Sequence, residues 1–309
     1  MSTVVETHNL TKRYRDKLAV NALNLTVQEG EIFGFLGPNG AGKTTTILML
    51  LGLTEPTSGR VSVCGFDPTR EPLEVKRRVG YLPENPGFYE DISARENLLY
   101  MARLNRIPED EIRRRVSEVL QQMELTDDSR RLVREFSRGM KQRLGIAEVL
   151  VKNPQAVILD EPTLGIDPDG AIRILEIIKS LNQRHNLTVM LSSHQLQQVQ
   201  AICSRVGIIV KGKLIVQGQM DELGRAILKE RQWNFLLETE GADGIEDDLR
   251  TIGGVDEIEK RPHGFFLRCT RDVRPEVVSL LARKRLPLLQ LRSEDPTLEE
   301  IYLKYFREA

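Results

Sequence analysis

The sequence predicts an α/β fold in two parts: a larger domain over about residues 1–219 and a small α+β domain over residues 220–309. In the larger domain short apolar strands alternate with amphipathic helices, a pattern typical of a parallel sheet covered by helices on both faces. Near residue 220 the charge balance changes from a small excess of basic residues to an excess of acidic ones. A length of 309 residues also fits two domains of unequal size.

The segment before residue 83 is expected to consist mainly of strands. Apolar runs and period-two alternation predict five strands in this segment. The polar turn at residues 28–31 suits a hairpin between the strands predicted at 23–27 and 32–36. At Thr44 the period becomes helical, and this helix runs to residue 53 and is stopped by Pro56. The predicted strands are 4–10, 23–27, 32–36, 60–63 and 79–82.

Helices dominate the next stretch and then alternate with strands. A helical block is predicted over residues 93–124, where Ile112, Val116, Val119 and Met123 fall on one face at helical spacing. The alternation that follows indicates strand–helix–strand units of a parallel sheet. Helices are predicted at 137–151, 168–184 and 195–203, and strands at 157–159, 187–191, 206–210 and 213–217.

The tail has its own order of elements. Its pattern predicts strand, helix, strand, strand, helix and strand, which is the order of ferredoxin-like domains. Trp233 is expected in the core of this domain, because it alternates with Phe235 and Leu237 at period two. The predicted ranges are 232–238, 243–252, 256–260, 264–269, 275–285 and 288–291, followed by a last helix at 297–306.

Composition excludes several classes of protein. The apolar fraction of 40% is that of a globular chain, and the net charge of −1 argues against a protein that coats nucleic acid. Cys64, Cys203 and Cys269 have no zinc-finger spacing, so we expect thiols buried in a reducing cytosol. The longest apolar stretch, 47–53, is too short to span a bilayer, and the N-terminus does not read as a signal peptide. We therefore expect that the chain does not cross a membrane by itself.

The sharpest motif is a glycine-rich loop between a predicted strand and a predicted helix. Its glycines allow backbone N–H groups to point at phosphate oxygens, and the helix N-terminus adds its dipole. Lys43 is expected to reach the β- and γ-phosphates and the Thr44 hydroxyl to coordinate Mg²⁺. The loop consists of Gly37, Pro38, Asn39, Gly40, Ala41, Gly42, Lys43 and Thr44.

A pair of carboxylates ends a second apolar strand. Asp160 and Glu161 follow residues 156–159 directly, at the edge where parallel sheets bind ligands. Asp160 is a candidate Mg²⁺ ligand through water, and Glu161 is placed to polarise an attacking water molecule. Alone, such a pair could be a solvated turn, but together with the phosphate-binding loop it predicts nucleotide hydrolysis.

From these motifs the chain resembles the nucleotide-binding subunit of an ABC transporter. The family has a signature near LSGGQ at a helix start, which corresponds here to Ser137, Arg138, Gly139 and Met140 at the family's distance before Asp160. Arg138 and Met140 depart from the usual pattern and are typical of one exporter subfamily. The resemblance implies an ABC cassette over residues 1–219, with a phosphate-loop NTPase fold, an N-terminal antiparallel β subdomain and a helical subdomain over about 85–150.

The resemblance assigns further roles. His194 would contact the γ-phosphate, and Tyr14 would stack on adenine with Val20 closing the same pocket. Asp167 lies in the loop through which two cassettes communicate, and Glu84 replaces the usual glutamine that touches Mg²⁺ and senses the membrane subunit. Implied catalytic residues are Lys43, Glu161 and His194; metal-binding residues are Thr44, Glu84 and Asp160; nucleotide-binding residues are Tyr14, Val20, 37–44, Thr45, 137–140 and Asp167.

The function that follows is ATP hydrolysis by the subunit of an exporter. ATP and Mg²⁺ are the expected cofactors, and the expected partners are a separate membrane permease at the cytoplasmic face of the cell membrane and a second cassette in a homodimer. The acidic-aromatic ending at 293–302 resembles drug, sodium and copper-site-maturation exporters. The alternatives are an ABC ATPase acting on ribosomes or DNA and a phosphate-loop kinase. No nucleic acid is expected, because acidic residues are interspersed with the arginines of 113–115 and 130–134.

Overall fold

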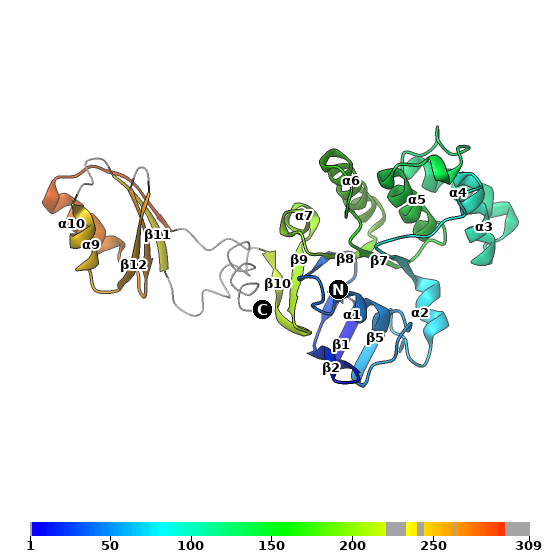
Figure 1. Cartoon of the computed structure of the whole chain (residues 1–309), viewed down its shortest axis with the longest axis horizontal. Helices are drawn as coiled ribbons and strands as arrows, with labels where there is room; N and C mark the ends of the chain where they lie inside the picture. The colour runs from blue at the N-terminus through cyan, green and yellow to red at the C-terminus, as the bar shows by residue number, and fades with distance from the viewer. Residues whose placement is uncertain (1, 221–232, 240–243, 262–263, 294–309) are drawn as a thin grey trace. The chain divides into compact units, whose positions relative to one another are not determined.

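The structure is a computed structural model that describes residues 2–220, 233–239, 244–261 and 264–293. The chain divides after Met220 into two compact units, which are described separately (Figure 1). Among the described residues, no helix is both long enough and apolar enough to span a bilayer.

A six-stranded sheet forms the centre of the first unit. Its strands follow the order β10-β9-β4-β8-β7-β6, and all neighbours are parallel except β9 and β10. Nearly every residue of the central strands is buried, as expected for a sheet covered on both faces. The strands are β4 (Ile32–Leu36), β6 (Val79–Leu82), β7 (Ala156–Asp160), β8 (Thr188–Ser193), β9 (Arg205–Val210) and β10 (Lys213–Gln219).

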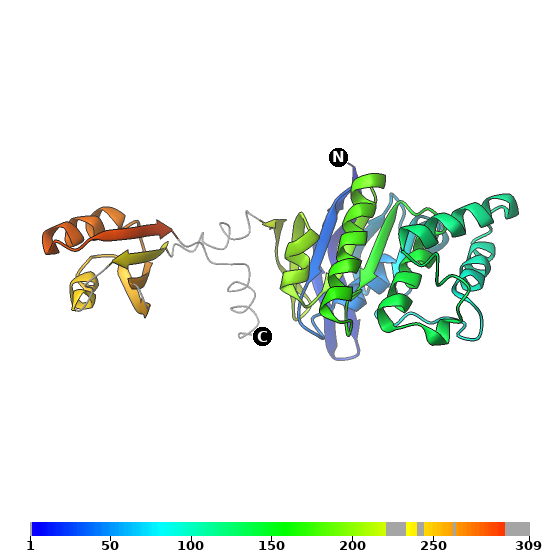
Figure 2. The ribbon, with the colours of Figure 1, turned by 90° about the horizontal axis from the view of Figure 1, so that it is seen from above.

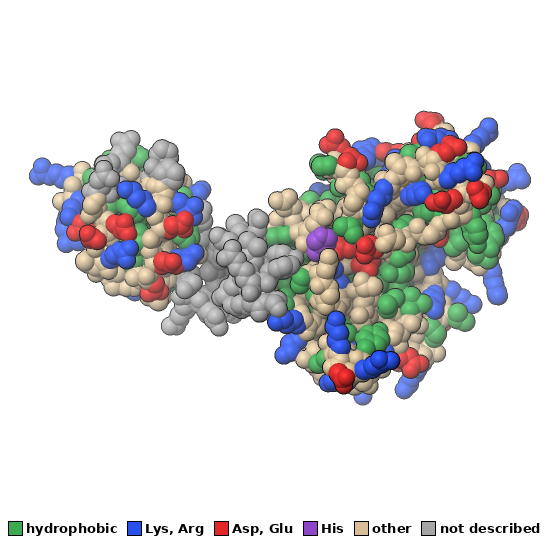
Figure 3. Space-filling view, in the orientation of Figure 1, with side chains coloured by type: hydrophobic (Ala, Val, Ile, Leu, Met, Phe, Trp, Pro, Cys, Tyr) green, Lys and Arg blue, Asp and Glu red, His purple; other side chains and the backbone are tan. Residues whose placement is uncertain are grey.

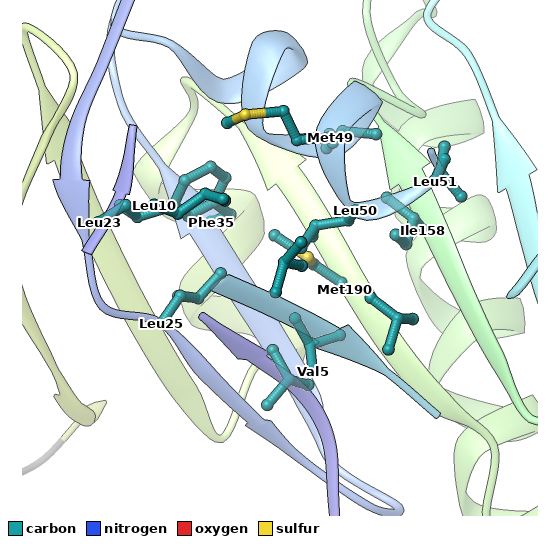
Figure 4. Close-up of a cluster of buried hydrophobic side chains, with 14 of the residues drawn as sticks. Val5, Leu10, Leu23, Leu25, Phe35, Met49, Leu50, Leu51, Ile158 and Met190 are labelled. Carbon is teal, nitrogen blue, oxygen red and sulfur yellow. The ribbon is translucent and has the colours of Figure 1, made fainter. Parts of the chain in front are cut away.

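Helices and a second sheet cover the two faces of this sheet. Phe33 and Phe35 of β4 belong to a core shared with the antiparallel sheet and with α1 (Lys43–Leu50) (Figure 4). Gly34 faces the other side, where a Cβ would lie 2.4 Å from Val199 of α7 (Leu196–Ile202). The longer helix α6 (Pro168–His185) packs beside α7. The predicted parallel sheet with helices is confirmed.

The N-terminal strands form a separate antiparallel sheet. It contains β1 (Thr3–Tyr14), β2 (Lys17–Leu23), β3 (Thr26–Gln28) and β5 (Ser58–Val63), with β1 paired to each of the others. The predicted hairpin across residues 28–31 is wrong, because β3 pairs with β1 whereas β4 pairs with β8 and β9. Gly30, at φ 74°, lies in the turn that carries the chain from one sheet to the other.

The predicted helical block at 93–124 is two helices. They are α3 (Ala94–Leu104) and α4 (Glu109–Gln122), and Pro108 precedes the second as its N-cap residue. Ser93 and Glu96 form a capping box that fixes the start of α3. With the turn η1 (Val133–Glu135) and α5 (Arg138–Leu150), these helices gather at one end of the unit (Figure 2). Helix α2 (Pro72–Arg78), which leads into β6, was not predicted from the sequence.

The second unit contains the predicted order of strands and helices. Its sheet order β12-β13-β11-β14 is antiparallel throughout. The prediction that Trp233 lies in the core is wrong. Its side chain is 41% exposed at the start of the strand and stacks on Phe235 instead of entering the core. The predicted helix at 297–306 lies outside the described residues. The elements are β11 (Trp233–Thr239), α9 (Ile245–Arg250), β12 (Val255–Arg261), β13 (Gly264–Cys269), α10 (Arg274–Lys284) and β14 (Leu288–Ser293).

Candidate functional site

A phosphate-type loop connects β4 to α1 at the carboxyl edge of the parallel sheet. Gly42 ends the loop with φ 107°, a conformation that favours glycine, and a Cβ there would lie 2.5 Å from the Ala19 carbonyl oxygen. At Gly37 a Cβ would lie 2.4 Å from the carbonyl oxygen of Ile209. The backbone can therefore take this path only with glycine at both positions. The first backbone N–H groups of α1 point into the loop and favour an anion.

Lys43 is the buried cation of this loop. Its ammonium donates to the carbonyl oxygens of Gly37 at 2.7 Å and Pro38 at 3.3 Å. It also lies 3.3 Å from Oε1 of Glu161, and both side chains are less than a tenth exposed. Because a buried charge needs compensation, this ion pair stabilises both groups inside the unit.

Thr44 and Asp160 join the helix to the end of β7. The Thr44 hydroxyl donates to Asp160 Oδ2 at 3.0 Å. The other carboxylate oxygen, Oδ1, is buried and has no hydrogen-bond partner in the described part of the chain. An anionic oxygen in this position is suited to a hard cation or its water ligands. The described residues contain no group of three or more His, Cys, Asp or Glu side chains that could hold a metal ion by themselves.

Glu161 is the most constrained carboxylate of the site. Its backbone has φ 49°, in the left-handed region, and its N–H donates to the Ser192 carbonyl oxygen at 3.0 Å. Oε1 lies 2.9 Å from Nδ1 of His194, and Oε2 accepts from the Ser193 hydroxyl at 3.5 Å. Strand β8 thus supplies contacts to a carboxylate that follows β7. A histidine side chain is visible beside acidic side chains on this unit (Figure 3).

Lys43, Thr44, Asp160 and Glu161 meet in one pocket of about 380 Å³, and Ser193 and His194, which contact Glu161, are not among the residues that line it. Lys17 and Ala19 line it and were not predicted. Val20 was expected to close this pocket, and that prediction is wrong. Its side chain is fully buried in the core and does not line the pocket, because neighbouring residues of β2 face opposite sides of the sheet. The pocket is lined by Tyr14, Lys17, Ala19, Pro38, Asn39, Gly40, Gly42, Lys43, Thr44, Thr45, Glu84, Asp160 and Glu161.

Tyr14 lines this pocket, and the pKa of Tyr81 is affected by two of the pocket's carboxylates. Tyr14 is 45% exposed, with the Lys12 ammonium 4.9 Å from the centre of its ring. Burial, together with the negative charges of Asp160 and Glu84, raises the pKa of Tyr81 to about 12. Glu84 itself is exposed, and it lines the pocket together with Asp160 and Glu161.

The signature residues and Asp167 lie outside this pocket. Ser137 caps α5, and its hydroxyl accepts from the Met140 N–H at 3.3 Å. Asp167 caps α6 by accepting from the Gly170 N–H at 3.0 Å. Arg138 packs against Gly165, where a Cβ would lie 2.6 Å from its guanidinium. A single chain therefore does not bring 137–140 or Asp167 to the phosphate-type loop.

Several arginines of the helical region are paired with acids. Arg114 and Arg115 form ion pairs with Glu118 and Glu111 along α4. Arg131 pairs with Asp128. Their charges are neutralised locally, as in a solvated helix face.

Comparison with known proteins identifies the family. Residues 20–164 match the family model described as ABC transporter. The chain is 45% identical over 223 residues to the bacitracin transport ATP-binding protein BcrA of Bacillus licheniformis, covering 72% of each chain. It is 34% identical to the uncharacterized ABC transporter ATP-binding protein YhcH of Bacillus subtilis (strain 168), over 100% of this chain and 98% of the relative.

The chain belongs to the ABC transporter ATP-binding proteins. It is 32% identical to the daunorubicin resistance ATP-binding protein DrrA3 of Streptomyces coeruleorubidus, over 97% of this chain and 95% of the relative. A solved ATP-binding subunit of an ABC transporter is 30% identical, with a TM-score of 0.66 over 73% of this chain and 93% of that one. The protein is thus an ATP-binding and ATP-hydrolysing subunit of an ABC transporter, a class that works as dimers with membrane permease subunits. Since this structural match leaves about a quarter of the chain uncovered, the ferredoxin-like assignment of the tail stays a prediction.

Proposed function

We propose that this subunit energises an exporter by binding ATP between two copies of the chain and hydrolysing it. The names of its relatives support export, because they describe bacitracin transport and daunorubicin resistance. The proposed site of action is the cytoplasmic face of the cell membrane, where a separate permease would hold the subunit. The permease would select the exported compound. We therefore propose only that the compound belongs to the same broad class as those named for the relatives.

In the proposed site the loop after β4 binds the triphosphate of ATP. The N–H groups at the start of α1 and the ammonium of Lys43 would take the phosphate oxygens. Tyr14 would stack on adenine at the open side of the pocket. Thr44 and Asp160 fit Mg²⁺, since Asp160 Oδ1 is a buried oxygen without a partner in the described chain, and Glu84 is a third candidate ligand. When bound, Mg²⁺ supplies charge neutralisation of the phosphates.

Glu161 is proposed as the general base that polarises the attacking water. The observation that carries this role is its carboxylate, which lines the pocket and is contacted by Lys43, Ser193 and His194. ATP would offer its phosphates to Lys43, so that the Lys43–Glu161 pair loosens and the carboxylate becomes available to water. His194 would hold the carboxylate and contact the γ-phosphate.

A second cassette is proposed to complete each site. Ser137, Gly139 and Asp167 lie at helix starts away from the pocket of their own chain. In a two-fold dimer these residues would face the loop of the other chain, where Ser137 and the N-terminus of α5 suit the γ-phosphate. We also propose residues 1–219 as the cassette, with a helical subdomain at about 85–150, and residues 220–309 as an accessory domain.

Substitution of Glu161 by Gln tests the base. Glu161→Gln keeps the shape of the side chain but removes its proton-accepting charge, so the full chain should bind ATP and lose hydrolysis by about 100-fold or more. Hydrolysis is measured as phosphate release at saturating ATP and Mg²⁺. The control is Glu31→Gln, because Glu31 is also well buried but pairs with Arg205 at the start of β4. Hydrolysis at the wild-type rate in Glu161→Gln would contradict the proposed base.

A further inference from the structure

We propose that Gln198 of α7 is a positioning residue for Glu161 and acts through Thr163. The inference rests on the proposed role of Glu161 and adds the side chains that hold its turn in place. Neither Gln198 nor Thr163 lines the nucleotide pocket. Their effect on catalysis would therefore be indirect.

Glu161 needs such support because its backbone conformation is unfavourable. A φ of 49° costs a residue with a Cβ roughly 1 kcal/mol, and such conformations persist where the surroundings impose them. The backbone supplies two hydrogen bonds: Glu161 N–H to the Ser192 oxygen at 3.0 Å, and Leu164 N–H to the Glu161 oxygen at 3.1 Å. Neither bond fixes where the following residues lie relative to α7.

Side-chain hydrogen bonds connect the turn that follows Glu161 to α7. The hydroxyl of Thr163, only 3% exposed, donates to the amide oxygen of Gln198. The Gln198 amide nitrogen donates to the Gln195 side-chain oxygen at 2.6 Å. The Gln195 N–H donates to the hydroxyl of Ser193 at 3.0 Å, and that hydroxyl donates to Glu161 at 3.5 Å.

These bonds form a closed ring with Glu161 at one point and Thr163 at another. The ring runs from the Glu161 carboxylate through Ser193, Gln195 and Gln198 to Thr163, and returns to Glu161 along the backbone. Within it Gln198 both accepts and donates, so its amide orientation is determined by its partners. Loss of Gln198 would release the loop after Glu161 from the helix that follows His194.

The neighbouring glutamines of α7 provide matched controls. Gln197 and Gln200 are on the same helix and exposed, and no hydrogen bond of their side chains is seen within the described residues. Leu196 and Val199 form the buried side of α7. Gln198→Leu and Gln200→Leu therefore change helix propensity and polarity by the same amount. Only Gln198→Leu removes the hydrogen bonds that connect Thr163 to α7.

The test combines Gln198→Leu and Thr163→Val in the full chain with ATP and Mg²⁺. Each should lower kcat about 10-fold with little change in KM, since displacement of a catalytic group by part of an ångström has effects of this order. The double variant should lose no more than either single variant, because both remove one link. Thr163→Ser keeps the hydroxyl and should retain most of kcat, and Gln200→Leu should match the wild type.

Several outcomes would overturn the proposal. Wild-type kcat in both single variants, or losses that multiply in the double variant, would show that the link does not position Glu161. An equal rise in KM would indicate general damage to the site. Each single variant tests the link by itself, so failure of one to fold leaves the other. If these variants keep kcat while Glu161→Gln abolishes hydrolysis, only the positioning role is wrong; wild-type hydrolysis in Glu161→Gln would overturn the base and the positioning role together.

Discussion

The Lys43 side chain contacts both the loop backbone and the carboxylate of Glu161. Its ammonium donates hydrogen bonds to two loop carbonyls and also forms an ion pair with the Glu161 carboxylate. The same cation therefore stabilises the loop and compensates a buried acid. A substitution at this position should affect both nucleotide affinity and stability.

Lys43→Ala should weaken ATP binding by about 10- to 100-fold, the loss expected when a charge-assisted hydrogen bond is removed. It should also lower the melting temperature, because Glu161 stays buried without its cation. Titration of ATP and thermal melting measure the two effects. Lys152→Ala is the control, since Lys152 donates to the carbonyls of Lys76 and Val79 outside the pocket. An unchanged ATP affinity in Lys43→Ala would exclude the phosphate contact.

The positions of the candidate site residues at the ends of buried strands follow from the sequence. The loop, Asp160, Glu161 and His194 each follow an apolar strand, and parallel strands bring their carboxyl ends to one edge. Val20 and Lys17 could not be assigned to a face in this way. No strand was predicted over residues 17–22, so there was no alternation from which to tell which side chains reach the pocket.

At the scale of elements, helix α5 connects the signature with the interior. Ser137 caps its first turn, and six of its 13 residues are buried where the helix packs on α3, α4, α6 and β6. Glu148 lies well inside this packing, and burial raises its pKa from 4.5 to about 7. The folded unit therefore favours the protonated carboxyl at a position where the unfolded chain ionises.

This shift gives the stability a pH dependence. Between pH 4.5 and 7 the folded chain keeps a proton that the unfolded chain has lost, so the contribution of Glu148 to stability is present below pH 4.5 and is lost as the pH rises through 7. Glu148→Gln stays neutral throughout. It should match the wild type near pH 4 and exceed it by roughly 1–3 kcal/mol near pH 8.

Denaturant unfolding at both pH values measures the difference. Glu118→Gln is the control, because Glu118 is exposed on α4 and pairs with Arg114. Its effect should be the same at both pH values. A Glu148→Gln variant that is less stable than the wild type at pH 8 would contradict the buried, neutral carboxyl.

Elements were easier to predict than their partners. The sequence located β4 and β6 to the residue, because each is a short apolar run with a charged residue directly before it and a proline within two residues after it. It could not reveal that β3 and β4 belong to different sheets, since adjacent strands with a polar turn look the same in either case. Pro108 lies within the helical block predicted at 93–124 and precedes α4 as its N-cap residue.

At the scale of the whole molecule, each chain has one phosphate loop and one signature. The proposed shared site predicts complementation between two inactive variants. In a mixed dimer of Lys43→Ala and Ser137→Arg, both lesions fall in one site, and the other site pairs an intact Lys43 with an intact Ser137. Mixing should restore one closable site per dimer.

ATP-dependent dimerisation on a sizing column and single-turnover hydrolysis measure this restoration. Steady turnover is a poorer readout, because both sites must fire if they alternate. Each variant alone is the control. No more dimer in the mixture than in either parent, after subunit exchange has been demonstrated, would exclude the shared site.

The position of Trp233 has a spectroscopic consequence. It is the single tryptophan of the chain, it belongs to the second unit, and it is 41% exposed while stacking on Phe235. Selectively excited tryptophan emission therefore originates in the second unit alone, whereas far-ultraviolet circular dichroism averages over both. Following the two signals through one melt separates the unfolding of the tail from that of the nucleotide-binding unit, without adding a label to either.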